Sequence, residues 1–177
     1  MRDILGAGDR PPRNNGRGRR ENRVPYTISV VGPAQADETE LAAAETVGRL
    51  LAERGHAVVT GGHGGVMEAA ARGAAIHDGV VLGILPGLER DANPFVTIAL
   101  PTGLGEMRNA LIIRAADAVI CVGTSWGSLS EVSLAMRTGV PVVLLGGWDV
   151  PQGPQLATTP QDAVRMAIRL AMRRRHH

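Results

Sequence analysis

The sequence predicts an α/β fold: a doubly wound, mostly parallel, Rossmann-like sheet of six or seven strands flanked by helices. Two observations carry this prediction. Six short runs rich in Val, Leu and Ile are apolar at consecutive positions, as expected of strands buried on both faces. Segments with helical spacing of apolar residues separate these runs, and a regular alternation of strand and helix is typical of parallel α/β domains.

The first half of the pattern opens with a β-branched run at 27–31 and a helix over 38–54. Gly55 suits the position just after the last turn of this helix. A strand at 57–60, a helix over 65–77 and a strand at 80–85 are predicted next. The apolar face of the first helix is formed by Leu41, Ala44, Val47 and Leu51.

The second half repeats the alternation. We expect strands at 95–100, 118–122 and 140–145, with helices over 105–115, 126–138 and 160–173. Pro160 suits the first turn of the last helix, where its missing N–H is no loss. The apolar face of that helix is formed by Val164, Ile168 and Ala171.

Composition excludes several kinds of chemistry. All 19 basic residues are arginine, so no Schiff base can form, which excludes pyridoxal-phosphate enzymes and class I aldolases. A P-loop is excluded for the same reason, because it needs a lysine. The single cysteine, Cys121, excludes an intramolecular disulfide and a cysteine-rich metal site. Aromatic residues make up 2% of the chain, which argues against a stacking surface for single-stranded nucleic acid.

Charge divides the chain into three parts. Residues 1–25 hold seven arginines, three acidic residues and few apolar ones, so we expect a disordered basic tail. Residues 26–172 are expected to form a single Rossmann-like nucleotide-binding domain, and residues 173–177 a basic C-terminal tail. A nucleic-acid-binding role for the first tail is an alternative to simple solvation.

The sequence predicts a cytoplasmic protein without membrane contact. No apolar run approaches the roughly 20 residues of a membrane span. The arginine-rich N-terminus also lacks the apolar core of a secretory signal.

Two glycine-rich turns follow predicted strands, whose carboxyl ends are where ligands bind in such folds. Residues 61–65 read Gly-Gly-His-Gly-Gly, and residues 123–128 combine glycines with three hydroxyl side chains. Glycine lets the backbone approach a ligand closely, and the following helix N-terminus favours an anion. We therefore expect a phosphate or nucleotide site; the alternative is that the glycines only form tight connections. The candidate ligand-binding residues are Gly32, Gly61, Gly62, Gly64, Gly65, Gly123, Thr124, Ser125, Gly127 and Ser128.

Two charged residues lie near these turns. Glu131 is one helical turn beyond Gly127, so its carboxylate is expected to point toward the strand ends; the alternative role is compensation of the helix dipole. Arg108 opens the helix after the fourth strand, where a surface or phosphate-holding role is the alternative. No metal site is predicted, because His63 has no second ligand nearby and is expected to face ligand or solvent.

Several motifs resemble those of the LOG-type proteins, a superfamily long labelled lysine decarboxylase-like. These motifs are Gly61-Gly62-x-x-Gly65-Val66-Met67-Glu68, Met107-Arg108-Asn109 and Gly123-x-x-x-Gly127-Ser128-x-x-Glu131. The chain is most similar to the subgroup that includes the molybdenum cofactor carrier proteins, through Gly103-Leu104-Gly105-x-x-Arg108-Asn109 and Ala116-Asp117-Ala118-Val119-Ile120. The absence of lysine conflicts with the decarboxylase label.

The resemblance implies a protein that binds a phosphorylated small molecule and hydrolyses the N-glycosidic bond of a nucleoside 5′-monophosphate. Arg108 and Glu131 would be its catalytic residues, with Glu131 stabilising an oxocarbenium-like sugar. Arg108 would act electrostatically, because arginine stays protonated. The alternative is a non-catalytic molybdenum cofactor carrier or nucleotide sensor. Thr124 and Ser125 favour it, because the phosphoribohydrolase pattern P-G-G-x-G-T-x-x-E has glycines there.

The resemblance also bears on cofactors and partners. It implies no required cofactor, and it allows a bound nucleotide or molybdenum cofactor. It further implies a homodimer or homotetramer. Nucleic acid is not among the expected partners.

Overall fold

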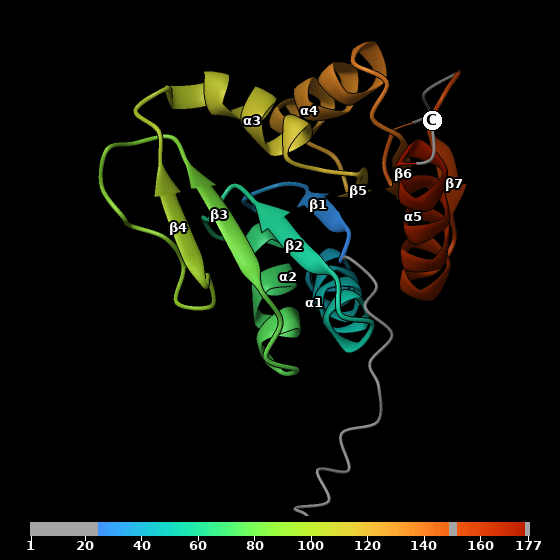
Figure 1. The fold of residues 1–177 in the computed structure, drawn as a ribbon, viewed down its shortest axis with the longest axis horizontal. Helices are drawn as coiled ribbons and strands as arrows, with labels where there is room; N and C mark the ends of the chain where they lie inside the picture. Colours follow the sequence, from blue (N-terminus) through green and yellow to red (C-terminus); the bar gives the residue numbers. More distant parts are fainter. Residues whose placement is uncertain (1–24, 149–151, 176–177) are drawn as a thin grey trace, which may run out of the picture.

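A computed structural model describes residues 25–148 and 152–175. Their strands form one seven-stranded sheet in the order β4-β3-β2-β1-β5-β6-β7, and every pairing is parallel (Figure 1). The strands are β1 (Thr27–Val31), β2 (Ala57–Thr60), β3 (Val81–Leu85), β4 (Ile98–Pro101), β5 (Ala118–Val122), β6 (Val142–Leu145) and β7 (Gln155–Ala157). The α/β, Rossmann-like prediction is confirmed.

Helices cover both faces of the sheet. One face carries α1 (Glu38–Glu53), α2 (Val66–Ala75) and α5 (Pro160–Arg175), whose buried residues join one apolar cluster. The other face carries a 3₁₀ turn, η1 (Gly105–Arg108), followed by α3 (Asn109–Arg114) and α4 (Trp126–Arg137), which join a second cluster. The central strands β1 and β5 are shielded between these layers, which explains why β5 is apolar throughout and β1 mostly so. None of the helices in the described part of the chain is long and apolar enough to cross a membrane.

The strand order positions a crevice beside β1. From β1 the chain first builds outward through β2, β3 and β4, and then returns to the other side of β1 to add β5, β6 and β7. Where the order reverses, the connections after β1 and β5 leave to opposite faces of the sheet. Ligands of doubly wound folds bind at this switch point, outside the carboxyl ends of the strands.

Beyond shifts of one or two residues at the ends of elements, the structure differs from the prediction in three places within the domain. β4 begins at Ile98 rather than residue 95, because Asn93 Oδ1 accepts a hydrogen bond from Phe95 N (3.1 Å) and holds the preceding segment in a turn. The helix predicted over 105–115 is divided into η1 and α3, and Gly105 at its start has a φ of +56°. β7 was not predicted, because its three residues are too short to form an apolar run.

The ends of the chain lie partly outside this description. The basic tail predicted over residues 1–25 is outside the described residues, apart from Pro25. Helix α5 continues through Arg173 to Arg175, so the first part of the predicted C-terminal tail is helical.

Helices α1 and α2 pack at close range through glycine, and this packing generates a prediction. A Cβ atom added at Gly48 would overlap the Ala70 carbonyl oxygen of α2. We expect Gly48→Ala to lower the free energy of unfolding by about 1–3 kcal/mol, as overpacked cores do. At an exposed position in a helix, a glycine-to-alanine substitution would instead raise the free energy of unfolding, because alanine is the better helix former. Chemical denaturation measures the change, and an unchanged or raised midpoint would contradict the close packing.

Candidate functional site

A cavity of about 520 Å³ opens at the carboxyl ends of β1 and β5. Its volume is within the range of small-molecule sites, about 300–1,000 Å³. Its walls come from the loops after β1, β3 and β5, from η1 and from the first turns of α2 and α4. The lining residues are Gly32, Ala34, Met67, Pro86, Glu106, Arg108, Asn109, Ser125, Trp126, Gly127, Ser128, Ser130 and Glu131.

Arg108 and Glu131 face this cavity together. Arg108 Nη1 lies 3.9 Å from Glu131 Oε1, and the two side chains are only 11% and 9% exposed. Arg108 is the last residue of η1, while Glu131 lies in the second turn of α4. Asn109 holds the guanidinium by accepting a hydrogen bond from Nη1 through its side-chain oxygen. The fold therefore brings together the two charged residues singled out from the sequence.

Burial dominates the electrostatics of this pair. Removal from water raises the pKa of the Glu131 carboxyl from 4.5 to about 7, although the nearby Arg108 opposes the shift. Burial likewise lowers the pKa of Arg108, while Glu131 and Glu106 act in the opposite direction. Both shifts show that the attraction across 3.9 Å does not offset the loss of hydration. The cavity thus holds a cation without full compensation and a carboxyl that titrates near neutral pH.

One nitrogen of the Arg108 guanidinium has no hydrogen-bond partner. Its Nε is buried and unpartnered within the described part of the chain. Gly61 gives the guanidinium room, because a Cβ atom there would lie 2.7 Å from Arg108 Nη2 and 2.7 Å from Met67 Sδ. The Arg108 side chain is therefore fixed in place across the end of β2 with part of its donor capacity unused.

The N-terminus of α4 contributes backbone donors. Ser125 and Ser128 form a capping box: Ser125 Oγ accepts from Ser128 N (3.0 Å), and Ser128 Oγ accepts from Ser125 N (2.8 Å). The N–H groups of Trp126 and Gly127 belong to the first turn and have no intrahelical partner. Because Ser125, Trp126, Gly127 and Ser128 all line the cavity, this helix end can bind an anion there.

The glycine turn at residues 61–65 lies outside the cavity wall, unlike the turn at residues 123–128. Gly62 accepts hydrogen bonds at its carbonyl from Asn93 N (2.8 Å) and Asn93 Nδ2 (3.1 Å), so it faces the β3–β4 connection. A Cβ atom at Gly65 would overlap the carbonyl oxygens of Pro33 and Ala34, so this glycine permits two loops to pack together. Neither Gly61, Gly62, Gly64 nor Gly65 is among the residues that line the cavity.

The remaining candidate ligand-binding residues also divide into those that line the cavity and those that do not. Gly32, Ser125, Gly127 and Ser128 line the cavity. Gly123 has a φ of +69° and lies against the carboxylate of Glu40, beside a separate cavity of about 300 Å³. Thr124 is exposed and lines neither cavity.

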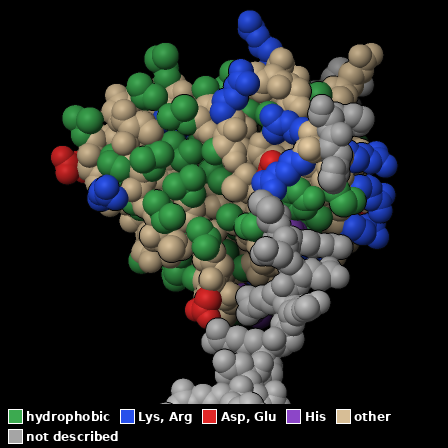
Figure 2. Space-filling model, viewed as in Figure 1, with side chains coloured by type: hydrophobic (Ala, Val, Ile, Leu, Met, Phe, Trp, Pro, Cys, Tyr) green, Lys and Arg blue, Asp and Glu red, His purple; other side chains and the backbone are tan. Residues whose placement is uncertain are grey.

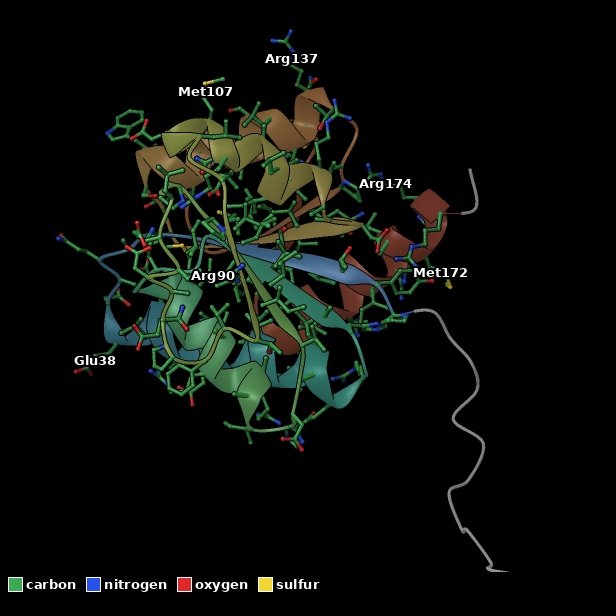
Figure 3. The ribbon with its side chains drawn as sticks, turned by 60° about the vertical axis from the view of Figure 1, so that its left-hand side comes forward. Glu38, Arg90, Met107, Arg137, Met172 and Arg174 are labelled. Carbon is green, nitrogen blue, oxygen red and sulfur yellow. The ribbon has the colours of Figure 1, made fainter. Side chains whose placement is uncertain are left out.

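Sequence reasoning missed several residues of the cavity wall. Asn109 and Met67 lie within the quoted motifs, so the motifs could have identified them as cavity residues. No motif or spacing in the sequence indicated Glu106 or Ser130. Met107, next to Arg108, is 78% exposed and points away from the body of the protein (Figure 3). Among the described residues, no group of three His, Cys, Asp or Glu side chains could hold a metal ion.

One family model and several known proteins match the chain. The model of the SLOG cluster4 family matches residues 25–172. An uncharacterized protein of Archaeoglobus fulgidus is 40% identical over 141 residues, which is 80% of this chain and 93% of that protein. The molybdenum cofactor binding protein of Rippkaea orientalis is 34% identical with a TM-score of 0.79, over 83% of this chain and 98% of its own. The molybdenum cofactor carrier protein of Chlamydomonas reinhardtii is 30% identical with a TM-score of 0.76, over 84% and 99%.

The raised pKa of Glu131 gives a pH-dependent contribution to stability. Between pH 4.5 and about 7 the folded protein holds this proton more tightly than the unfolded chain. The free energy of unfolding should therefore fall as pH rises through that window. Glu131→Gln should remove this contribution, whereas Glu106→Gln, which changes an exposed carboxylate of the same cavity, should retain it. Denaturation midpoints across the window test this. Parallel pH profiles for the parent chain and Glu131→Gln would disprove it.

Proposed function

The chain belongs to the SLOG cluster4 family, and from this premise we propose that it carries or senses a phosphorylated nucleotide or pterin-type molecule bound in the cavity. The observation that carries the proposal is Arg108, a buried cation with an unpartnered Nε, in the same cavity as the N-terminus of α4. The chain has no lysine, so an anionic group in this cavity must be held by arginine, hydroxyls and backbone N–H groups.

A phosphate group suits this set of donors. The guanidinium presents a planar fork of N–H groups that matches phosphate oxygens. The N–H groups of Trp126 and Gly127, at the positive end of the helix dipole, add neutral donors. Phosphate would supply the negative charge that the 3.9 Å contact with Glu131 supplies only in part.

The rest of the cavity suits a planar ring. Trp126 is 80% exposed and lines the cavity, and its ring rests against Trp148 at a centroid distance of 5.6 Å. A purine or a pterin offers a flat face for such an indole. The identity of the two solved relatives, one a molybdenum cofactor binding protein and one a molybdenum cofactor carrier, supports a pterin-type ligand.

Ligand binding should depend on Arg108. Titration with guanosine or adenosine 5′-monophosphate can be followed by the fluorescence of Trp126, which lines the cavity. Arg108→Ala should weaken binding about 10- to 100-fold, because hydrogen bonds to charged groups contribute about 1.5–3 kcal/mol.

Arg90→Ala is the matched control, because Arg90 is exposed and donates to the Ala99 carbonyl (2.8 Å) rather than lining the cavity. Equal affinity of Arg108→Ala and the parent chain would reject the proposed phosphate site. Inorganic phosphate alone should compete with the nucleotide, which separates phosphate recognition from ring recognition.

N-glycosidic hydrolysis of a nucleoside 5′-monophosphate is the second candidate function. The observation in its favour is that Glu131, with a pKa of about 7, shares the cavity with Arg108. Ionised Glu131 would orient a water molecule and stabilise positive charge on the ribose as the C1′–N bond breaks. The base would leave with the electron pair of the C1′–N bond, stabilised by Arg108, and would take up a proton from solvent. The water oxygen would bond to C1′, and its proton would pass to Glu131.

Incubation with nucleoside 5′-monophosphates tests this second candidate directly. Hydrolysis should release free base and ribose 5-phosphate, both separable by chromatography. Glu131→Ala should reduce the rate by at least about 100-fold, the scale of general acid–base contributions, while Glu106→Ala should leave most of it. Saturable nucleotide binding without any base release would leave the carrier function and exclude the hydrolase.

A further inference from the structure

A second cavity, of about 300 Å³, lies at the carboxyl ends of β5 and β6. It opens on the face of the sheet that α1 and α5 cover, whereas the cavity of Arg108 opens beside η1 and α4. The walls of this β6 cavity come from the first turns of α1, the ends of the two strands and the start of α5. It shares no described lining residue with the cavity of Arg108, so it is a separate site.

The β6 cavity contains one carboxylate. Of the described residues that line it, Glu40 alone carries a charge. This carboxylate lies against the backbone of Gly123, because a Cβ atom added there would overlap Glu40 Oε1. Glu40 Oε2 accepts a hydrogen bond from Asp37 N (3.1 Å) in the capping box of α1. Glu40 Oε1 accepts none from the described residues, so part of the carboxylate remains available to a ligand.

Arginine does not compensate this carboxylate. In Figure 2, basic side chains gather along the edge of the molecule where α5 lies, and α5 contains five arginines. The wall of the β6 cavity is formed by Thr158 and Pro160, however, and the first arginine of the helix, Arg165, is paired with Asp162 (2.8 Å). An anion in the β6 cavity would therefore meet the charge of Glu40 without a cation from the described lining. That charge disfavours a phosphorylated ligand here.

The helices disfavour a cation as well. Both α1 and α5 begin at the wall of the β6 cavity, so the positive ends of two helix dipoles point toward it. These dipoles stabilise the ionised carboxylate of Glu40, and they repel a positive ligand. The group that suits the cavity is thus neutral and donates hydrogen bonds.

The shape of the β6 cavity favours a single flat ring system. Val122 and Leu145 are 1% and 8% exposed, and with Ala43 they supply apolar surface. Gly147 has a φ of +96°, and a Cβ atom there would lie 2.8 Å from the Gly123 carbonyl oxygen, so the wall between β5 and β6 is bare backbone. A volume of about 300 Å³ is at the lower end of small-molecule sites, about 300–1,000 Å³. It suits a base better than a whole nucleotide.

We propose that the β6 cavity binds a neutral heterocycle through paired N–H donors to Glu40, as presented by the edge of guanine or of a pterin. In both rings a ring N–H lies beside an exocyclic amino group, and a carboxylate can accept both bonds in parallel. Adenine presents an unprotonated ring nitrogen beside its amino group, and this acceptor faces the carboxylate unfavourably. The site lies outside the cavity of the proposed function and does not depend on it.

The test is equilibrium dialysis of the full chain against guanosine, inosine, adenosine and pterin, none of which carries phosphate. Guanosine should bind about 10-fold tighter than inosine, which lacks the amino group, and adenosine should bind more weakly still. Comparison of guanosine with pterin identifies the source of the shared edge.

Glu40→Gln should weaken guanosine or pterin binding about 10- to 100-fold, because it removes the charge and one acceptor oxygen. Glutamine retains the capping box, so the start of α1 is preserved. Glu38→Gln is the matched control, because Glu38 also belongs to the first turn of α1 but points away from the protein (Figure 3). Thr39→Phe, at an exposed position on the cavity wall, should block binding by filling the space.

Two further variants separate the β6 cavity from that of Arg108. A base can also stack on Trp126, so Trp126→Ala and Arg108→Ala should both retain guanosine binding. Loss of nucleotide binding in Arg108→Ala with retained guanosine binding would support both sites independently. Thermal unfolding followed by circular dichroism identifies any variant that has lost its fold. Absence of guanosine and pterin binding, adenosine binding as tight as that of guanosine, unchanged affinity in Glu40→Gln, or lost affinity in Trp126→Ala would overturn the proposal.

Discussion

The burial of Arg108 beside Glu131 is the constraint on which the arrangement of the cavity depends. Each group loses hydration, and a contact of 3.9 Å does not compensate, as the opposite pKa shifts of the two groups show. A charged pair of this kind persists only where the surrounding structure holds both partners in place. Here the strand order supplies that support, because it places η1 and α4 on the same side of the β1–β5 switch point.

Glycines make this arrangement sterically allowed. Gly61 leaves room for the guanidinium of Arg108, and Gly65 lets the loop after β2 pack on the carbonyls of Pro33 and Ala34. Gly32 has a similar role, since a Cβ atom there would lie 2.7 Å from Val66 Cγ1. Glycine in such turns can therefore shape a site without contacting the ligand. The backbone donors of the cavity come from the turn at residues 123–128. The glycines of the turn at residues 61–65 instead leave room for the groups that form its walls.

This distinction explains how far the sequence could predict the site. Apolar runs that form both-face-buried strands are a local signal, so β1, β2 and β5 were predicted with their observed ends. The quoted motifs also singled out Arg108 and Glu131, which line one cavity in the structure. The Gly62 carbonyl accepts hydrogen bonds from Asn93, 31 residues away, and the spacing of motifs along the sequence does not predict such a contact. The hydrogen bond from Arg175 to the Pro25 carbonyl, 150 residues away, is equally a tertiary contact that no local pattern predicts.

Glu131 distinguishes the two candidate functions in physical terms. A phosphate dianion bound at Arg108 repels a second negative charge nearby, so phosphate binding favours the protonated form of Glu131. Orientation of a water molecule for hydrolysis needs the ionised form. With a pKa already raised to about 7 by burial, the carboxyl gains a proton when an anion enters beside it. The same cavity is therefore better suited to holding a phosphorylated ligand than to cleaving it. That balance is the physical reason to place the carrier function ahead of the hydrolase.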